Sequence, residues 1–420
     1  MNIVYIDHYA GSPDMGMEFR PYYLAREWVK MGHSVSMIAG DFSHLRKINP
    51  TVSQDMQRQR IDGIDYYWLK SGQYEGNGFR RAFSIFRFCR KLSRWKRWIA
   101  KTLQPDVVIS SSTYPVDSIV AQRICRCTDR KLRRSYRTKH IHEIHDMWPS
   151  TLKEIGGMSA RHPFVIMMQY GENYAYKHAD AVVSMPGHAE AYMREHGLAE
   201  GKFFHIPNGI VLDEWESPAP LPEKHQKRLG KLRADGSFIV GYFGGHALSN
   251  CLMTLIEAAG KLDGEAGQSI RFVLVGDGVE KKKLKKTAKK RGLKNITFLP
   301  PVNKKAIPTL VESFDCTYIG TVDSPLYRFG ACMNKMYDGM MAGKPVIFAI
   351  NAPPTPVEQC GCGIIVPPED TDEIVKAVRK LASMSAEERK EMGQRGKDEV
   401  LKNNTYRKLA EDFLRVMETK

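Results

Sequence analysis

The sequence predicts an α/β protein of two domains, each built on a doubly wound, mostly parallel sheet. Short apolar runs alternate with helical stretches along the chain, which is the pattern of βαβ units. This pattern starts again after residue 236. A chain of 420 residues with 42% hydrophobic content is also large enough to bury two cores of ordinary size.

The first half opens as a βαβ unit. An apolar strand at 3–6 leads into a loop that contains Gly16, then into a helix that ends at Gly32 before the next strand at 35–38. Further strands are expected at 64–69, 107–110, 140–144, 181–184 and 203–206, separated by helical stretches. Ligands of such sheets bind at the carboxyl ends of the strands, so the residues that follow each strand are the candidates for a site.

One strand end carries a histidine and an aspartate. His145 and Asp146 follow the strand at 140–144, and a Trp-Pro sequence stops it. Such a pair can aim two polar groups into a cleft, and imidazole is the side chain best able to share protons near pH 7. The same pair can instead cap the helix that follows.

The second half repeats the opening after an expected linker. Residues 213–223 are acidic and rich in proline and 224–236 are polar, which predicts a connection between domains. A strand at 237–243 then leads through Gly244, Gly245 and His246 into a helix at 250–262. Backbone N–H groups of such a loop point into a crevice that can hold phosphate, although a Gly-Gly loop alone is weak evidence.

The stretch 327–346 is predicted to be a loop, a short helix and the start of a strand. On the helix, Asp338 stands four positions after Asn334 and three after Lys335, which places the three side chains on one face near the N-terminal end. A helix N-terminus attracts anions, and a carboxylate one turn further can accept bonds from the hydroxyls of a sugar. This chemistry suits a nucleoside diphosphate. The alternative is a core helix on which Lys335 and Asp338 form a solvated ion pair.

This stretch resembles the signature of the retaining glycosyltransferases of family 4, which have the GT-B fold. In that family an acidic residue stands five positions before the glycine of a Gly-x-Pro-Val ending, as Asp338 stands before Gly343. The family usually has a second acidic residue eight positions earlier, where it orients the donor sugar. This chain has Gly330 at that position, so it lacks the side chain that makes this contact in the family.

Two further sequences resemble one bacterial branch of the family. The Asn334-Lys335 pair and the Asp-x-Trp-Pro sequence that begins at Asp146 are similar to those of enzymes that build surface polysaccharides, including N-acetylfucosamine transferases. The resemblance covers nearly the whole chain. It implies two Rossmann-like domains facing a central cleft: an acceptor-binding domain at 1–212, on which the last helix at about 404–420 packs back, and a nucleotide-sugar-binding domain at 213–403.

The resemblance also implies a set of site residues. It places His145 and Asp146 beside the transferred sugar and Lys335 on the departing diphosphate, which makes these three the catalytic candidates. The family commonly has an arginine and a lysine just after the Gly-Gly loop, which this chain lacks. Positive charge must then come from Lys335 and Arg328. The expected substrate-binding residues are Gly16, Gly244, Gly245, His246, Asn250, Arg328, Asn334 and Asp338, with a purely turn-forming role as the alternative for Gly16.

The activity that the resemblance implies is retaining transfer of a hexosyl or N-acetylaminosugar group. The donor would be a UDP-sugar and the acceptor a lipid-linked saccharide of bacterial surface polysaccharide, either O-antigen (lipopolysaccharide) or capsule. We expect a same-face substitution in which the leaving phosphate helps to deprotonate the acceptor, without metal or cofactor. A nucleotide-sugar 2-epimerase of the same fold is the alternative, and its pattern matches Asp338 less well.

The formal net charge of +16 suits nucleic acid, an anionic membrane surface or a polyanionic substrate. No recognisable nucleic-acid-binding module is present, so no nucleic-acid partner is expected. Basic residues that suit the headgroups of an anionic bilayer alternate with Phe79, Phe83, Phe86, Trp95, Trp98 and Ile99. They are Arg80, Arg81, Arg87, Arg90, Lys91, Arg94, Lys96, Arg97 and Lys101.

This stretch predicts attachment to a membrane, and the alternative is an ordinary helix with a basic outer face. Neither a spanning helix nor a signal peptide is expected from the distribution of apolar residues. The expected location is therefore the cytoplasm, at the inner face of the cytoplasmic membrane.

Overall fold

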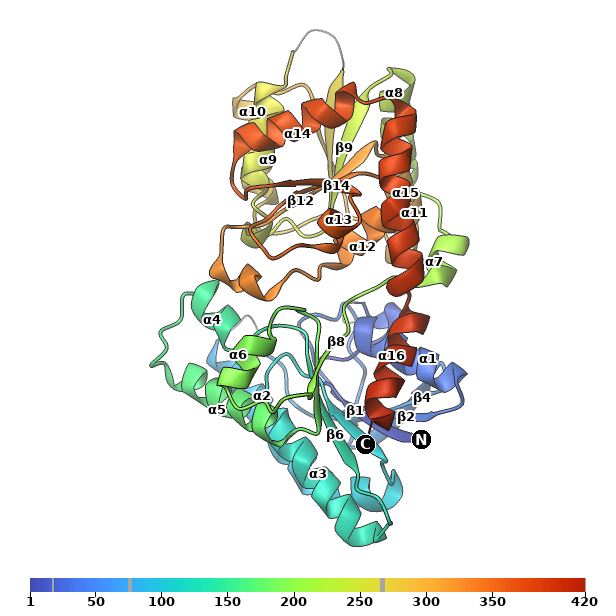
Figure 1. The fold of residues 1–420 in the computed structure, drawn as a ribbon, viewed down its shortest axis with the longest axis vertical. Helices are drawn as coiled ribbons and strands as arrows, with labels where there is room; N and C mark the ends of the chain where they lie inside the picture. The colour runs from blue at the N-terminus through green and yellow to red at the C-terminus, as the bar shows by residue number, and fades with distance from the viewer. Residues whose placement is uncertain (17–18, 75–77, 265–268, 420) are drawn as a thin grey trace. The chain divides into compact units, whose positions relative to one another are not determined.

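The chain forms two compact α/β units in the computed structural model, which describes residues 1–16, 19–74, 78–264 and 269–419 (Figure 1). The first unit is Met1–Pro207 together with Tyr406–Lys420, and the second is Asn208–Thr405. The last helix, α16 (Tyr406–Glu418), therefore belongs to the first unit. The chain first leaves this unit after Pro207, a few residues before the boundary expected at 212.

The first unit is built on an eight-stranded sheet in the order β3-β4-β2-β1-β5-β6-β7-β8. Only the pairing of β3 with β4 is antiparallel. The strands are β1 (Asn2–Ile6), β2 (Ser34–Gly40), β3 (Gln57–Ile61), β4 (Ile64–Leu69), β5 (Val107–Ser110), β6 (Lys139–Ile144), β7 (Ala181–Ser184) and β8 (Phe203–His205). Strand β3 was not predicted because its residues are mostly polar and exposed. It pairs with β4 at the sheet edge through its backbone, and Arg58 and Gln59 also bond to Asp65 and Trp68 of that strand.

Helices cover both faces of this sheet (Figure 1). Helices α1 (Phe19–Lys30) and α16 lie together on one face, where Trp28 Nε1 donates to the carbonyl of Ala410 at 3.0 Å. On the other face, Val4 and Ile6 of β1 pack against α2 (Phe79–Thr102) and α3 (Asp117–Leu132). Helix α5 (Pro163–His178) packs beside α3. The remaining short elements are η1 (Pro13–Met15), α4 (Ser150–Glu154) and α6 (Glu190–Glu195).

The second unit is built on a wholly parallel sheet in the order β11-β10-β9-β12-β13-β14. Its strands are β9 (Phe238–Phe243), β10 (Ile270–Val275), β11 (Ile296–Leu299), β12 (Cys316–Gly320), β13 (Val346–Ala349) and β14 (Gly363–Val366). This order reverses between β9 and β12, so a switch point for ligand binding lies beside the carboxyl end of β9.

Helices also form two layers around the second sheet (Figure 1). One layer holds α9 (Leu252–Lys261), α10 (Lys281–Lys290) and α14 (Thr371–Ser383), which share a core with β9. The other holds α8 (Glu223–Ala234), α11 (Ile307–Glu312), α12 (Asn334–Met341) and α15 (Ala386–Asn403). The remaining elements are α7 (Leu212–Glu216), η2 (Leu248–Asn250), η3 (Lys304–Ala306), η4 (Pro325–Phe329) and α13 (Pro356–Gln359).

The expected linker at 224–236 is instead the helix α8 of the second unit. Leu229 and Leu232 are buried against β9, while the rest of this helix is mostly charged. The prediction was wrong because a helix needs only a narrow apolar stripe to pack on a sheet, and two leucines among lysines and arginines leave the segment polar on average.

Candidate active site

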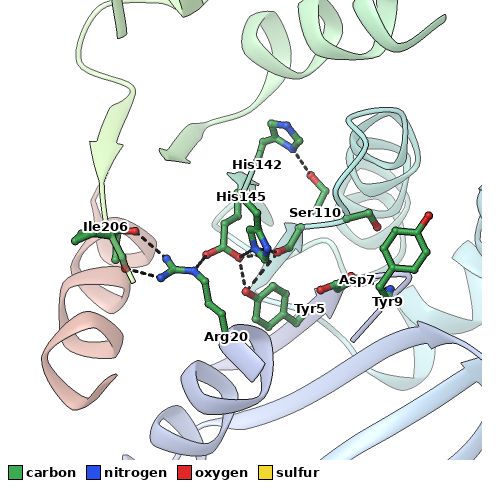
Figure 2. Close-up of polar contacts among 12 residues, drawn as sticks. Tyr5, Asp7, Tyr9, Arg20, Ser110, His142, His145 and Ile206 are labelled. Atoms are coloured by element: carbon green, nitrogen blue, oxygen red, sulfur yellow. Dashed lines mark hydrogen bonds and ion pairs between the residues drawn. The ribbon is translucent and has the colours of Figure 1, made fainter. Parts of the chain in front are cut away.

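Three neighbouring strands of the first unit end in polar residues (Figure 2). Asp7 follows β1, Ser111 follows β5 and His145 follows β6. Because these strands are parallel, their carboxyl ends lie at the same edge of the sheet. The predicted position of His145 at a strand end is therefore confirmed by the fold.

Glu143 connects these strand ends. It is fully buried in β6, on the face of the sheet that α1 covers. Arg20 Nε of α1 donates to Oε1 at 3.0 Å, the Ser111 hydroxyl donates to Oε2 at 2.6 Å, and the Tyr5 hydroxyl also donates to Oε2. Burial opposes ionisation of Glu143, but the charges of Arg20 and His145 hold the pKa of this carboxyl well below its usual range.

His145 turns one ring nitrogen toward Glu143. Its Nε2 lies 2.9 Å from the Ser111 hydroxyl and 3.2 Å from Glu143 Oε2. Burial alone would lower the pKa of the imidazole, but the carboxylates of Glu143 and then Asp7 raise it to about 9. At neutral pH these neighbours favour the imidazolium, whereas the sequence pointed to a ring that exchanges protons near pH 7.

Asp7 is the second buried carboxylate that acts on His145. Its Oδ1 accepts a bond from the backbone N–H of Tyr9 at 2.9 Å, while Oδ2 has no hydrogen-bond partner among the described residues. Burial raises the pKa of Asp7 to about 6, although the positive charge of His145 opposes that shift. Asp7 thus supplies negative charge at the strand ends, while only one of its two carboxylate oxygens accepts a hydrogen bond from the described residues.

Asp146 differs from His145 in its exposure. Its side chain is exposed, and it makes no hydrogen bond or ion pair within the described part of the chain. The helix that follows, α4, has Pro149 at its N-cap and no side-chain cap. The alternative in which His145 or Asp146 caps this helix is therefore wrong, and both side chains are available to a ligand.

Gly16 has a local structural reason to be glycine. Its φ of +94° lies in the left-handed region, and an added Cβ would lie 3.0 Å from the backbone nitrogen of Lys47. Gly16 also forms an isolated β-bridge with Arg46. These contacts support the turn-forming role, and a position near a diphosphate stays a prediction.

In the second unit, Lys335 of α12 lies against the Gly-Gly loop. Its Nζ donates to Asn250 Oδ1 at 2.5 Å and lies 3.4 Å from the Tyr242 hydroxyl. An added Cβ on Gly244 would be 3.8 Å from the same nitrogen. Burial lowers the pKa of Lys335 to about 8. A partly desolvated cation thus lies beside the exposed backbone of Gly244 and Gly245.

The Gly-Gly loop is held by two side-chain bonds. Asn250 Nδ2 donates to the carbonyl oxygen of Gly245 at 2.9 Å, and the Tyr242 hydroxyl donates to the same oxygen at 2.5 Å. Gly244 has a φ of +129°, which favours glycine, and nothing lies within 4 Å of a Cβ built on Gly245. Tyr242 and Asn250 therefore hold the carbonyl group of Gly245, while the backbone of both glycines stays exposed.

Asp338 is half-buried one turn further along α12. Its carboxylate has no hydrogen bond or ion pair within the described part of the chain. Burial raises the pKa of Asp338, while the charge of Lys304 lowers it and that of Glu214 raises it. The alternative of a solvated ion pair between Lys335 and Asp338 is wrong, because the lysine bonds to Asn250 instead.

Asn334, His246 and Arg328 are the other residues predicted for this site outside the glycines and Asn250. Asn334 is the exposed first residue of α12. His246 is fully buried in the loop, and neither of its ring nitrogens has a hydrogen-bond partner among the described residues. Burial, then the charge of Lys281, lowers its pKa to about 4. Arg328 is exposed on η4 and lines a separate cavity of about 540 Å³ with Asp323 and Asn351.

Sequence reasoning missed the buried partners of these residues. A carboxylate inside a strand that lies in the middle of a sheet, as Glu143 does, was the available signal, because such a group must be paired when it is buried. Asp7, directly after β1, was a second signal, since it stands at a strand end like His145. Nothing in the sequence pointed to Arg20, Ser111 or Tyr242 as their partners.

The basic and aromatic stretch forms α2, and its residues divide between two faces. Phe79, which is 86% exposed, Phe83 and Phe86 lie on the outside with Arg90, Arg94 and Arg97, each three or four positions from the next. Trp95, Trp98 and Ile99 do not lie on this face, because Ile99 is buried and both tryptophans pack against the core under α2.

Neither a membrane span nor a metal cluster is found in the described residues. No helix there is both long and apolar enough to cross a bilayer. Likewise, no three His, Cys, Asp or Glu side chains in the described ranges are grouped to hold a metal ion. The Asp-x-Asp sequence at 370–372 serves α14, where Asp370 accepts the N–H bonds of Asp372 and Glu373 as the N-cap.

Two families match the chain, one in each unit. The family described as "Glycosyl transferase 4-like domain" matches residues 15–209, and "Glycosyl transferases group 1" matches residues 231–399. The first match ends close to the end of the first unit, and the second covers most of the other unit.

Two curated relatives are similar to parts of the chain. The putative colanic acid biosynthesis glycosyl transferase WcaI of Escherichia coli (strain K12) is 27% identical over 186 residues, which are 41% of this chain and 44% of that protein. The alpha-D-kanosaminyltransferase of Streptomyces kanamyceticus is 24% identical over 215 residues, 51% of this chain and 54% of that protein. Each match therefore spans about half of the relative's length.

Solved structures are similar over the full length. Sucrose-phosphate synthase from Thermosynechococcus elongatus has a TM-score of 0.73 at 16% identity, with 99% of this chain and 98% of that chain covered. Anabaena HepE in complex with UDP and glucose has a TM-score of 0.66 at 14% identity, with all of both chains covered. At these identities the likeness shows the fold, which is GT-B.

Proposed function

Since the chain belongs to the GT-B glycosyltransferases, with a 4-like domain followed by a group 1 domain, we propose that it uses a UDP-sugar as its donor. The proposed reaction retains the configuration of the sugar and transfers it to a lipid-linked saccharide in surface polysaccharide synthesis. The similarity to WcaI, described as a colanic acid biosynthesis enzyme, supports this class of acceptor. The crystal structure of HepE with UDP and glucose supports the donor.

The observation that carries the proposal is the pair of groups on α12. Lys335 lies beside the exposed Gly-Gly loop, where a cation and the backbone N–H of Gly245 suit a diphosphate. The N–H groups of Gly244 and His246 already donate to the carbonyl oxygens of Val275 and Asp277. One turn further, the unpaired carboxylate of Asp338 suits the vicinal hydroxyls of a ribose. A single helix thus offers contacts to both ends of a nucleoside diphosphate.

The proposed chemistry is a same-face substitution. The bond between the sugar carbon and the donor phosphate breaks, and a bond to the acceptor oxygen forms on the same face. The acceptor proton passes to the leaving diphosphate, so no protein nucleophile is required. Lys335 would stabilise the negative charge that grows on the diphosphate, and His145 and Asp146 would contact the transferred sugar. Neither a metal nor a cofactor is part of the proposal.

The outer face of α2 is the proposed contact with an anionic membrane surface. Exposed Phe79, Phe83 and Phe86 suit insertion among headgroups, and exposed arginines on the same face suit anionic lipids. This arrangement would hold the enzyme at the inner face of the cytoplasmic membrane, where a lipid-linked acceptor is available.

The function is tested by titration and by transfer assays. UDP should bind with a measurable heat, and a panel of UDP-sugars with a bacterial membrane lipid extract should give a labelled lipid product from one of them. Release of UDP that depends on the extract supports transfer. Conversion of the donor sugar without any acceptor would instead show an epimerase, and absence of UDP binding would overturn the proposed donor.

A further inference from the structure

We infer that Glu143 is a positioning residue that keeps the His145 ring charged and directs its Nδ1–H outward, as a hydrogen-bond donor to an anionic oxygen of the substrate. The inference rests on the proposed function, because it assigns His145 an electrostatic role in the same reaction. It also excludes His145 as the base that deprotonates the acceptor.

The hydrogen bonds around Ser111 determine which ring nitrogen points inward. The Ser111 hydroxyl donates its proton to Glu143 Oε2 at 2.6 Å, so its oxygen is left to accept from Nε2 of His145 at 2.9 Å. Nε2 therefore carries a proton whether the ring is neutral or charged. Nδ1 has no hydrogen-bond partner in the described ranges, and the side chain is 14% exposed. The free nitrogen is therefore the one that a ligand can reach.

The charges around the ring favour a second proton on Nδ1. Asp7 after β1 and Glu143 on β6 supply negative charge, and Arg20 on α1 supplies positive charge that is paired with Glu143 (Figure 2). His142, on the opposite face of β6, stays neutral because burial lowers its pKa to about 4. Asp146, the next residue, is exposed. Two nearby carboxylates thus face one ring, and the pKa of about 9 agrees with this balance.

Glu143 can stay ionised in the interior because it has three donors. Arg20, Ser111 and Tyr5 all donate to its two oxygens. Arg20 is itself held in place, since its guanidinium donates to the carbonyl oxygens of Ile206, at 2.9 Å, and Pro207 (Figure 2). A buried carboxylate with charge-assisted bonds of this kind keeps its charge and its orientation.

An imidazolium cannot accept the proton of an acceptor hydroxyl. It can donate from Nδ1 to an oxygen that gains negative charge as the donor bond breaks, and that interaction strengthens toward the transition state. The acceptor proton then has to leave with the diphosphate, as in the proposed substitution. Glu143 contributes to this through His145 and does not itself touch the substrate.

The first test measures the ring directly, in the full chain without substrate. Histidine labelled with ¹⁵N is titrated by NMR, and His145→Gln assigns the resonance. Both ring nitrogens of His145 should be protonated at pH 7.5 in the parent protein. A neutral ring at that pH would overturn the inference, whatever the nucleotide donor proves to be.

The second test uses Glu143→Gln with a matched control. Glu172 is another buried carboxylate of the first unit, bonded to Gln169, Tyr176 and Tyr192 and not to His145. Glu143→Gln should lower the pKa of His145 by one unit or more, while Glu172→Gln should leave it unchanged. An unchanged His145 titration in Glu143→Gln would show that Glu143 does not set the charge.

The third test is the pH profile of transfer. If the charged ring is required, kcat of Glu143→Gln should fall as the pH rises from 6 to 8, while that of the parent changes little, because the variant loses its proton in that range. The two enzymes should approach each other at pH 6. If kcat of the variant instead rises with pH, His145 acts as a base. If kcat of the variant is lower than that of the parent by the same factor at every pH, Glu143 has a merely structural role.

Discussion

Lys335 Nζ lies 2.5 Å from Asn250 Oδ1, and the amide nitrogen of the same asparagine donates to the carbonyl oxygen of Gly245. One side chain therefore positions both the cation and the loop that we propose to hold the diphosphate. An amide oxygen orients the ammonium without neutralising it, so the positive charge of Lys335 remains available to an anion.

Replacement of Lys335 by alanine should lower turnover more than donor binding. Negative charge on the leaving diphosphate grows toward the transition state, so a group that stabilises it affects kcat more than KM. Steady-state kinetics with the UDP-sugar that gives product in the panel measure both. Lys344→Ala is the matched control. This lysine precedes the amino end of β13, whereas the Gly-Gly loop beside Lys335 follows the carboxyl end of β9. A change confined to the donor KM would contradict the role of Lys335.

Asp338→Asn should weaken UDP binding while leaving the fold intact. A bond between a ribose hydroxyl and a carboxylate contributes about 1.5–3 kcal/mol, so Kd should rise roughly tenfold to a hundredfold. Calorimetric titration with UDP gives the affinity. Equal affinity for parent and variant would remove Asp338 from the nucleotide site.

The same substitution should not lower thermal stability. Burial raises the pKa of Asp338 in the folded protein, so its ionisation at neutral pH opposes folding. Since the carboxylate has no partner within the described residues, its replacement by an amide takes a hydrogen-bond partner away from no other residue. Melting of the variant at pH 7 should therefore occur at the parent's temperature or above it, and a clear drop would reveal a structural role for this side chain.

The pair of Arg20 and Glu143 should make the first unit sensitive to acid. The folded-state pKa of Glu143 lies below its unfolded value, so the stabilisation is present at neutral pH and is lost as the pH falls below the ordinary range of a glutamate. Glu143→Gln leaves the Arg20 guanidinium buried beside a neutral group, which costs about 3 kcal/mol or more at pH 7.

Thermal unfolding between pH 7 and pH 2 distinguishes this effect from general destabilisation, because the stabilisation is lost only below the ordinary range of a glutamate. The difference in stability between the parent and Glu143→Gln should be largest at pH 7 and should shrink as the pH falls. A difference that is the same at every pH would show that ionisation of Glu143 does not stabilise the fold.

Replacement of Arg90, Arg94 and Arg97 by glutamine should release the protein from anionic vesicles. Each arginine near such a surface contributes about 1 kcal/mol, so the loss of three should weaken binding roughly a hundredfold at low salt. Co-sedimentation with vesicles that contain phosphatidylglycerol measures this. Added salt should weaken attachment of the parent as well.

A control with the same change in charge distinguishes a specific contribution of the α2 surface from a general effect of net charge. Lys282, Lys286 and Lys289 are exposed on α10 of the second unit, and their replacement by glutamine also removes three positive charges. This control should still sediment with the vesicles. If the two triple variants bind equally, α2 is an ordinary helix with a basic outer face.

Local patterns in the sequence were enough to predict every strand of the first sheet except β3, strand β9 of the second sheet and the position of α12. The backbone repeats every two residues in a strand and every 3.6 in a helix, so a few neighbouring side chains show which segments bury one face. The same patterns put Lys335 and Asp338 near the start of one helix. They could not find β3 or α8, whose apolar content is too low to show a period.

Only the tertiary structure decided what these side chains meet. Lys335 bonds to Asn250, which is 85 positions away, and Arg20 pairs with Glu143 across 123 positions. Sequence patterns placed His145 at a strand end, but its charge depends on carboxylates from β6 and from the end of β1. Periodicity is a property of adjacent residues, whereas the charge of a buried group depends on desolvation and on partners that the fold brings together from distant parts of the chain.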